Sequence, residues 1–395
     1  MASMDIATEN QMEINIKTVH KNPIDKEVQQ IFKPLNIMQM LVLNPKFSIK
    51  NGVISPNNNL NKFILIGGAV IYITIHIHRI VEILIDDNFR RYSKVDFLLF
   101  ASIFDFTFRC LGIIINCYTN FKQTKKATLL ILYYQEVHRF ISDRTSDKRF
   151  IFRTWLSVLC IFGFYFTICA YFYFFYLKPP WNVLVYLLIG VTLDSNVIYV
   201  LRLIKLLTDT IVLWNIQMLL LLKKECSVVH HDKLFHAYVH ALECYRIAIN
   251  IFQPSILYKT IETFCQGLID IEIVIEFLKL YSKNTYKEQP NPVSSILLST
   301  WILKNLIMHI ILSLKLDDFY EAIKFAQYSC TFIMVKDGTD SQKTLCKNIL
   351  RAHRALFTKM SVCGLFEMDI CHPMRLVALF AHYTIVLLQF AFLQS

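Results

Sequence analysis

The sequence of 395 residues is poor in charged residues, glycine and proline. Only 18% of the residues are Asp, Glu, Lys or Arg, and there are 9 glycines and 10 prolines. The prolines fall between the long apolar runs, so each run can form an unbroken helix. Because 55% of the residues are hydrophobic and the mean hydropathy is +0.42, the apolar surface exceeds what a water-soluble protein of this size buries. These values predict a membrane protein.

Signatures of catalytic and metal sites are missing as well. There is no glycine-rich phosphate loop, no His-Glu-x-x-His and no Gly-x-Ser-x-Gly. None of the 11 cysteines belongs to a Cys-x-x-Cys pair, and none lies in the segments expected outside the cell. His236 and His240 stand one helical turn apart and could bind a metal ion, but a solvated helix is their ordinary interpretation. We therefore expect no enzymatic activity, no cofactor and no metal.

Seven apolar stretches have about the 20 residues that a helix needs to cross a bilayer. They are residues 63–85, 95–118, 151–177, 181–204, 256–280, 294–314 and 374–393. We interpret the further apolar segment 206–222 as the fourth helix continuing into the cytosol, and an eighth span is the alternative. The predicted fold class is an all-α polytopic membrane protein with seven transmembrane helices.

Basic residues indicate which side each loop faces. The segments 1–62, 119–153, 202–259 and 315–375 hold 31 of the 41 Lys and Arg, and the alternate segments 86–94, 178–182 and 279–293 hold 7. The positive-inside rule then places the N-terminus inside and the C-terminus outside, the reverse of G-protein-coupled receptors. The net charge of +11 follows from this bias and the anionic inner leaflet, so no nucleic-acid partner is expected.

The last apolar stretch is interrupted by polar side chains. These are His382, Tyr383, Thr384 and Gln389. His382 and Gln389 are seven positions apart and share a helical face with Ile385, Val386 and Leu393. Because a polar amide is costly against lipid, Gln389 should face a neighbouring helix or a water-filled pore.

Residues 382–390, His-Tyr-Thr-Ile-Val-Leu-Leu-Gln-Phe, resemble the signature of insect gustatory receptors. That signature is Thr-Tyr, five mostly apolar residues and Gln-Phe, with His382 here in place of the usual Thr. The preceding Cys-Gly-Leu-Phe at 363–366 with Asp369, the chain length and the long basic loop before the last span are similar too. Residues 1–250 resemble the family only in layout.

The resemblance implies a ligand-gated, non-selective cation channel, a homo- or heterotetramer in the plasma membrane of sensory neurons. In that picture Gln389 contributes to an extracellular gate ring, Phe390 packs when the gate moves, and Tyr383 anchors the helix. The chain would divide into a cytoplasmic segment (1–62), six transmembrane helices with the ligand site (63–314), cytoplasmic anchor helices (315–373) and the pore-lining helix (374–395). The expected ligand is a small-molecule tastant, with plant secondary (bitter) compounds as the favoured class.

Within the anchor region, we expect Asp317 and Asp318 to precede a helical run at 319–335. Thr339 or Asp340 should cap a second helix at about 341–362.

The ligand should meet the aromatic outer ends of the second, third, fourth and sixth spans. Our candidates are Phe104, Tyr171, Trp181, Tyr186 and Trp301, together with the charged residues Asp105 and Lys304. Asp105 and Arg109 are one turn apart and should neutralise each other; alternatively, Asp105 faces the pocket and holds a basic or hydroxylated ligand.

Two rival functions remain. An odorant-receptor-type channel subunit shares the inverted layout but has a less similar C-terminal motif. A secondary transporter would usually show interrupted helices in related halves, which are not visible here.

Overall fold

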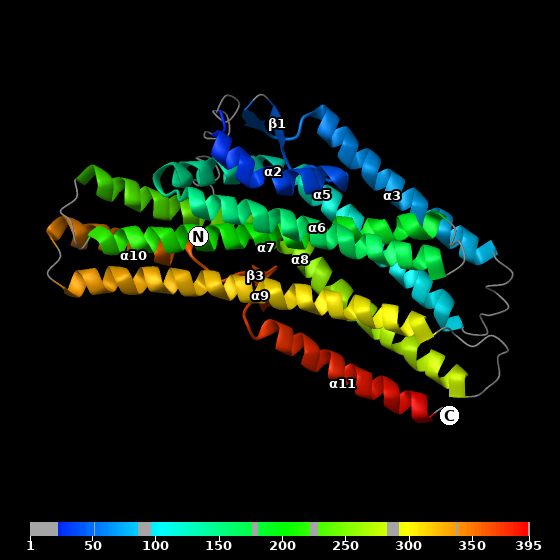
Figure 1. Ribbon diagram of the computed structural model, residues 1–395. Helices are drawn as coiled ribbons and strands as arrows, with labels where there is room; N and C mark the ends of the chain where they lie inside the picture. Colours follow the sequence, from blue (N-terminus) through cyan, green and yellow to red (C-terminus); the bar gives the residue numbers. More distant parts are fainter. Residues whose placement is uncertain are drawn as a thin grey trace.

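The computed structural model describes residues 23–393 apart from 51, 86–95, 176–180, 222–227, 283–291 and 337–338. This part of the chain is almost wholly helical (Figure 1). Its helices are α2 (Lys26–Leu41), α3 (Asn59–Ile85), α5 (Asp96–Phe140), α6 (Arg144–Phe175), α7 (Trp181–Leu221), α8 (Val228–Ser282), α9 (Pro292–Val335), α10 (Asp340–Leu356) and α11 (His372–Leu393). Two short antiparallel hairpins pair β1 (Ser48–Lys50) with β2 (Val53–Ser55) and β3 (Ser361–Val362) with β4 (Phe366–Glu367).

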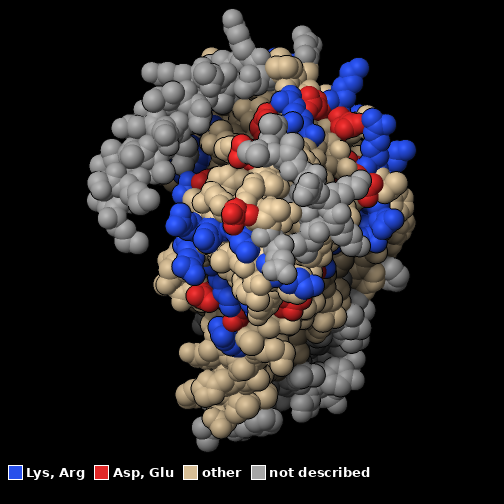
Figure 2. All heavy atoms as spheres, turned by 90° about the vertical axis from the view of Figure 1, so that its left-hand side faces the viewer, with Lys and Arg blue, Asp and Glu red and all other residues tan. Residues whose placement is uncertain are grey.

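The long helices form a bundle, and α11 lies along one side of it (Figure 1). The helix α8 packs against α5 and α7, while α6 and α9 each pack against α7. The helix α11 contacts α8 and α9. Figure 2 looks onto the end of the bundle at which α10 lies, and Lys and Arg side chains are spread over this face.

In the described part of the chain, four helices are long and apolar enough to cross a membrane. They are Asn59–Glu82, Phe100–Phe140, Arg144–Tyr171 and His372–Phe390. The expected spans 181–204, 256–280 and 294–314 are helical too, but they carry charged side chains that the bundle buries against one another. The count of seven spans and their orientation stay predictions.

Two expectations for the inner extensions of the helices are tested. The segment 206–222 continues the fourth helix as predicted, because α7 runs unbroken to Leu221. The helical run predicted at 319–335 is present, but it continues α9 without a break at Asp317 and Asp318. A helix of 44 residues is much longer than the ~20 that a bilayer needs, so α9 itself supplies this extension.

The helix α10 begins where the sequence predicts and ends earlier. Thr339 and Gln342 form a reciprocal capping box, each side chain accepting a hydrogen bond from the other residue's backbone N–H. The helix ends at Leu356 rather than at 362, because the chain turns into the β3–β4 hairpin. Cys363 and Gly364 adopt positive φ angles of 50° and 75° in this turn, which helical backbone does not allow.

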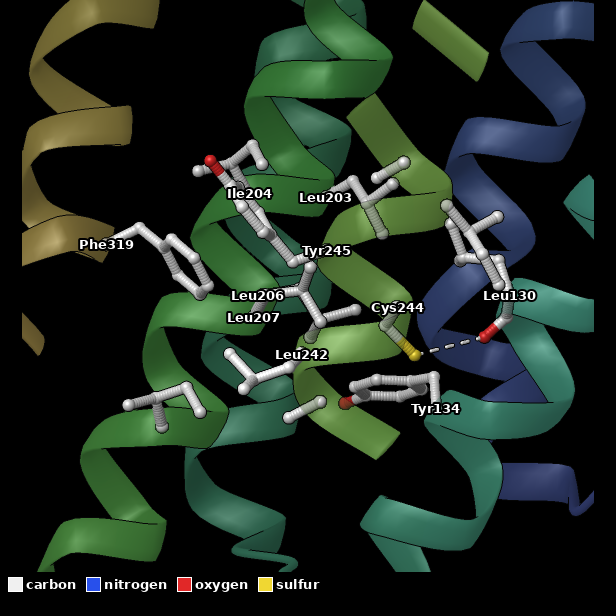
Figure 3. Packing of buried hydrophobic residues seen from close by; sticks show 14 of the residues in the cluster. Leu130, Tyr134, Leu203, Ile204, Leu206, Leu207, Leu242, Cys244, Tyr245 and Phe319 are labelled. Atoms are coloured by element: carbon white, nitrogen blue, oxygen red, sulfur yellow. Dashed lines mark hydrogen bonds between the residues drawn. The ribbon is translucent and has the colours of Figure 1, made fainter. Parts of the chain in front are cut away.

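The hydrophobic core lies where α5, α7, α8 and α9 meet. Figure 3 shows Leu130, Tyr134 and Tyr245 among these packed side chains, with the Cys244 thiol donating to the Leu130 carbonyl at 3.4 Å. The N-terminal helix α2 joins this core, and Phe32 is completely buried. The sequence predicted only a cytoplasmic segment there.

Candidate functional site

A buried charge cluster joins four helices inside the bundle. Asp194 of α7 is completely buried and lies 2.7 Å from Lys259 of α8, measured from Oδ1 to Nζ. Its Oδ2 atom binds Lys304 of α9 and accepts a hydrogen bond from the Tyr165 hydroxyl of α6 at 2.8 Å. Lys259 also pairs with Glu262 at 2.9 Å. Two carboxylates therefore balance two ammonium groups, which makes their burial tolerable. We call Tyr165, Asp194, Lys259, Glu262 and Lys304 the charge cluster.

A second ion pair lies nearby on α5. Arg109 is buried and its Nε donates to Asp105 Oδ1 at 2.9 Å. Gln266 of α8 donates to the same oxygen, also at 2.9 Å. The predicted neutralisation of Asp105 by Arg109 is confirmed, because both form one hydrogen-bonded pair.

Trp301 of α9 links the charge cluster to this ion pair. The Lys304 ammonium lies 4.0 Å from the Trp301 ring centroid, and the Arg109 guanidinium lies 5.5 Å from it. The Tyr165 ring meets Trp301 edge-on, with centroids 5.6 Å apart. Cations within about 6 Å of an indole ring are attracted by its quadrupole. Trp301 is therefore held on several sides by charged and aromatic groups.

The predicted ligand residues are brought together only in part. Trp301, Lys304 and Asp105 gather around the charge cluster, with Arg109 between Asp105 and Trp301. Phe104 instead stacks on Phe108 along α5, with ring centroids 4.5 Å apart.

Tyr171, another ligand candidate, lies on α6 six residues beyond Tyr165. Trp181 and Tyr186 belong to α7, and their side chains lie outside the described residues.

Sequence reasoning missed much of the charge cluster. Asp194 is a single carboxylate in the apolar stretch 181–204, and an ionisable residue in a predicted span is a signal that could have found it. Lys259 was counted only among the basic residues of segment 202–259, and Glu262 lies in the expected span 256–280 without a role of its own. Tyr165 is one of many aromatic residues on α6, so nothing in the sequence distinguishes it.

The helix α11 is attached to the bundle along one face. Phe380 is buried beside Gly267 of α8, where a Cβ atom would lie 2.5 Å from the Phe380 ring. Tyr383 meets Phe264 edge-on at 5.6 Å, which is compatible with the anchoring role expected for it. Glycine at position 267 thus permits the close approach of the two helices.

The predicted pore residues lie mostly on the other face. His382, Ile385, Gln389 and Phe390 are exposed, and Val386 is half-buried. The side chain of Leu393 lies outside the described residues. Thr384 donates to the Phe380 carbonyl at 2.7 Å, which satisfies its hydroxyl within the helix. An exposed amide on an apolar helix needs protein or water beside it in a membrane.

Within the described ranges, no group of three or more His, Cys, Asp or Glu side chains is placed to hold a metal ion. His236 and His240, the pair singled out in the sequence, have stacked rings 6.3 Å apart.

Comparison with known proteins rests on structure alone. No family model and no curated protein matches the sequence. The fold is similar to that of the insect olfactory receptor OR5 from Machilis hrabei in complex with eugenol, with a TM-score of 0.58 and 12% sequence identity. The match covers 92% of this chain and 100% of that chain. At this identity the likeness shows a shared fold, and the chain therefore has the fold of an insect olfactory receptor.

Proposed function

We propose that this chain is a subunit of a gustatory-type, ligand-gated, non-selective cation channel. The observation that carries the proposal is the exposed face of α11, where Gln389 and Phe390 lie uncovered on a chain with an olfactory-receptor fold. The same helix contains the run 382–390 that resembles the gustatory receptor signature.

The exposed face of α11 suits a pore formed by four subunits. Four Gln389 amides would form a neutral polar ring, which admits cations with little discrimination between them. Ile385 and Val386 lie on adjoining positions and would make an apolar constriction that closes by dewetting. The attachment of α11 through Phe380 and Tyr383 leaves this face free for the other subunits.

A small organic tastant would bind in the outer half of the bundle, near Trp301. The solved olfactory receptor of this fold is in complex with a small molecule, eugenol, which supports a ligand of that size. Trp301 offers a flat aromatic surface next to the charge cluster. A ligand that moves Trp301 would also move Lys304, which lies over its ring and pairs with Asp194. Plant secondary (bitter) compounds are the ligand class that the gustatory resemblance favours.

An odorant-receptor-type subunit is the second candidate, because the shared fold is that of an olfactory receptor. A need for a co-receptor would distinguish it from a chain that conducts alone.

The test is whole-cell recording from heterologous cells that express only this chain, with G-protein signalling blocked. Plant alkaloids, glycosides, sugars and eugenol are applied in turn, and surface expression is confirmed by labelling. A fast cation current whose permeation changes in Gln389→Ala supports the proposal. A current carried without any dependence on ligand, or unaltered by Gln389→Ala, contradicts the assignment of α11 to a gated pore.

A further inference from the structure

A groove of about 570 Å³ runs between α6 and α9, and residues of α7 also line it. Its walls are apolar, with Leu156 on α6 and Leu303, Ile307 and Ile311 on α9. Leu156 and Leu303 at its edges are 50% and 58% exposed, so the groove opens sideways from the bundle. These residues belong to expected spans, and in a bilayer the opening would face lipid.

The charges in the groove are all positive. Lys304, Arg202 and Lys315 line it, and no Asp or Glu is among its described lining residues. At the outer end, the ammonium of Lys304 is already neutralised by Asp194. The unsatisfied charge therefore lies at the inner end.

Arg202 is the cation at the inner end that lacks an anion. Its Nη2 atom donates to the Arg153 carbonyl at 2.6 Å and to the Ser157 hydroxyl. Its Nε atom is buried and meets no acceptor among the described residues. No carboxylate in the described part of the chain forms an ion pair with Arg202. A half-buried guanidinium that lines the groove without a carboxylate partner is suited to a phosphate.

Lys315 supplies a second positive charge at this end. It pairs with Asp318 at 2.6 Å, but the two side chains are 33% and 46% exposed. Such an exposed ion pair contributes little to stability, so the Lys315 ammonium can also bind a phosphate. Lys304 and Lys315 are eleven residues apart on α9, or about 16 Å along a helix. This length matches one leaflet of a hydrocarbon core about 30 Å thick.

We infer that the groove binds one anionic phospholipid from the leaflet on the Arg202 side. Its phosphate contacts Arg202 and Lys315, and one acyl chain lies along Leu303 and Ile307 towards Lys304. A zwitterionic lipid also has a phosphate, but its own cation cancels that charge, so it leaves the positive charge of Arg202 and Lys315 uncompensated. A water-soluble tastant has no need of a groove that opens to lipid. The inference rests on the membrane placement of the proposed function, but not on channel activity.

The test uses the full chain, purified and delipidated in a neutral detergent. Dioctanoyl-phosphatidylserine and dioctanoyl-phosphatidylcholine are titrated separately, and native mass spectrometry counts the lipids bound to each subunit. We expect one phosphatidylserine per subunit, bound about tenfold or more tightly than phosphatidylcholine because of its net charge. Inorganic phosphate at the same concentration should not displace it, since the acyl chain supplies part of the affinity.

Variants separate the basic end from the apolar walls. Arg202→Gln combined with Lys315→Gln should weaken phosphatidylserine binding by about tenfold or more, whereas Arg202→Lys retains part of it. Cys160→Trp fills the groove from an exposed position and should weaken binding with the charges intact. Lys324→Gln is the matched control, because Lys324 is exposed on α9 outside the groove.

Several outcomes overturn the inference. These are equal binding of the two lipids, displacement by inorganic phosphate, no effect of the double variant, and occupation of the groove by a neutral tastant instead of lipid. Size-exclusion profiles and melting midpoints show that each variant is folded. Because bound lipid is counted without recording current, loss of channel activity and loss of the lipid site are separate results.

Discussion

Replacement of Asp194 by Asn tests whether the charge cluster holds the bundle together. Asp194 is completely buried and pairs with both Lys259 and Lys304. After Asp194→Asn, Lys259 keeps Glu262 at 2.9 Å, but Lys304 loses its carboxylate partner inside the protein. Breaking a buried pair by removing one partner costs about 3–5 kcal/mol, because a charge is left uncompensated. We expect a loss of stability of that size.

The second variant identifies the origin of this loss. Lys304→Met removes the stranded ammonium, so the double variant Asp194→Asn/Lys304→Met should recover roughly 2 kcal/mol or more. Lys304→Met alone should cost less than Asp194→Asn, because Asp194 keeps Lys259. As a control, Asp318→Asn breaks the exposed pair with Lys315 and should cost less than about 1 kcal/mol.

The assay is unfolding of the purified chain in detergent, followed with a thiol-reactive dye that reports the buried Cys244, Cys330 and Cys346. The expected order of stability is wild type and Asp318→Asn, then Lys304→Met and the double variant, then Asp194→Asn. The reasoning is refuted if Asp194→Asn is as stable as Asp318→Asn. It is also refuted if adding Lys304→Met lowers the stability of Asp194→Asn further.

Three further predictions follow from other parts of the chain. Gln389→Ala should change single-channel conductance or basal leak at unaltered surface expression, because the amide ring is lost; unchanged currents would make Gln389 a packing residue. Trp301→Ala should shift the ligand dose–response curve about tenfold while conductance stays the same, whereas a conductance change without a shift would remove it from the ligand site. Burial lowers the pKa of Lys46 from its ordinary 10.5 to about 7 in the folded chain. Between pH 7 and 9 the unfolded chain therefore binds one proton more than the folded chain at this residue. The free energy of unfolding of the wild type should then rise with pH by up to about 1.4 kcal/mol per pH unit. Lys46→Met should flatten this pH dependence in melting curves from pH 6 to 9, and an unchanged slope would contradict the lowered pKa of Lys46.

Much of the helical layout could be predicted from local sequence patterns. Long apolar stretches without proline predicted the helices, the apolar segment 206–222 predicted the extension of α7, and Thr339 predicted the start of α10. These features depend only on residues that are close in sequence. They are the apolar runs and the capping residue Thr339, which precedes its partner Gln342 by three positions. The Asp105–Arg109 pair belongs to the same class, because its members are one helical turn apart.

The charge cluster could not be predicted in this way, because its members are distant in sequence. Tyr165, Asp194 and Lys304 come from three helices, and their contacts depend on how those helices pack. The continuity of α9 through Asp317 and Asp318 likewise overrides local capping preferences, since the helix is stabilised by burial of Leu316 and Phe319.

Composition and one short motif therefore predicted a helical membrane protein and the helix on which to look for a pore. The partners of each buried charge depended on packing, because a carboxylate such as Asp194 is stable in the interior only where separate helices bring cations to it.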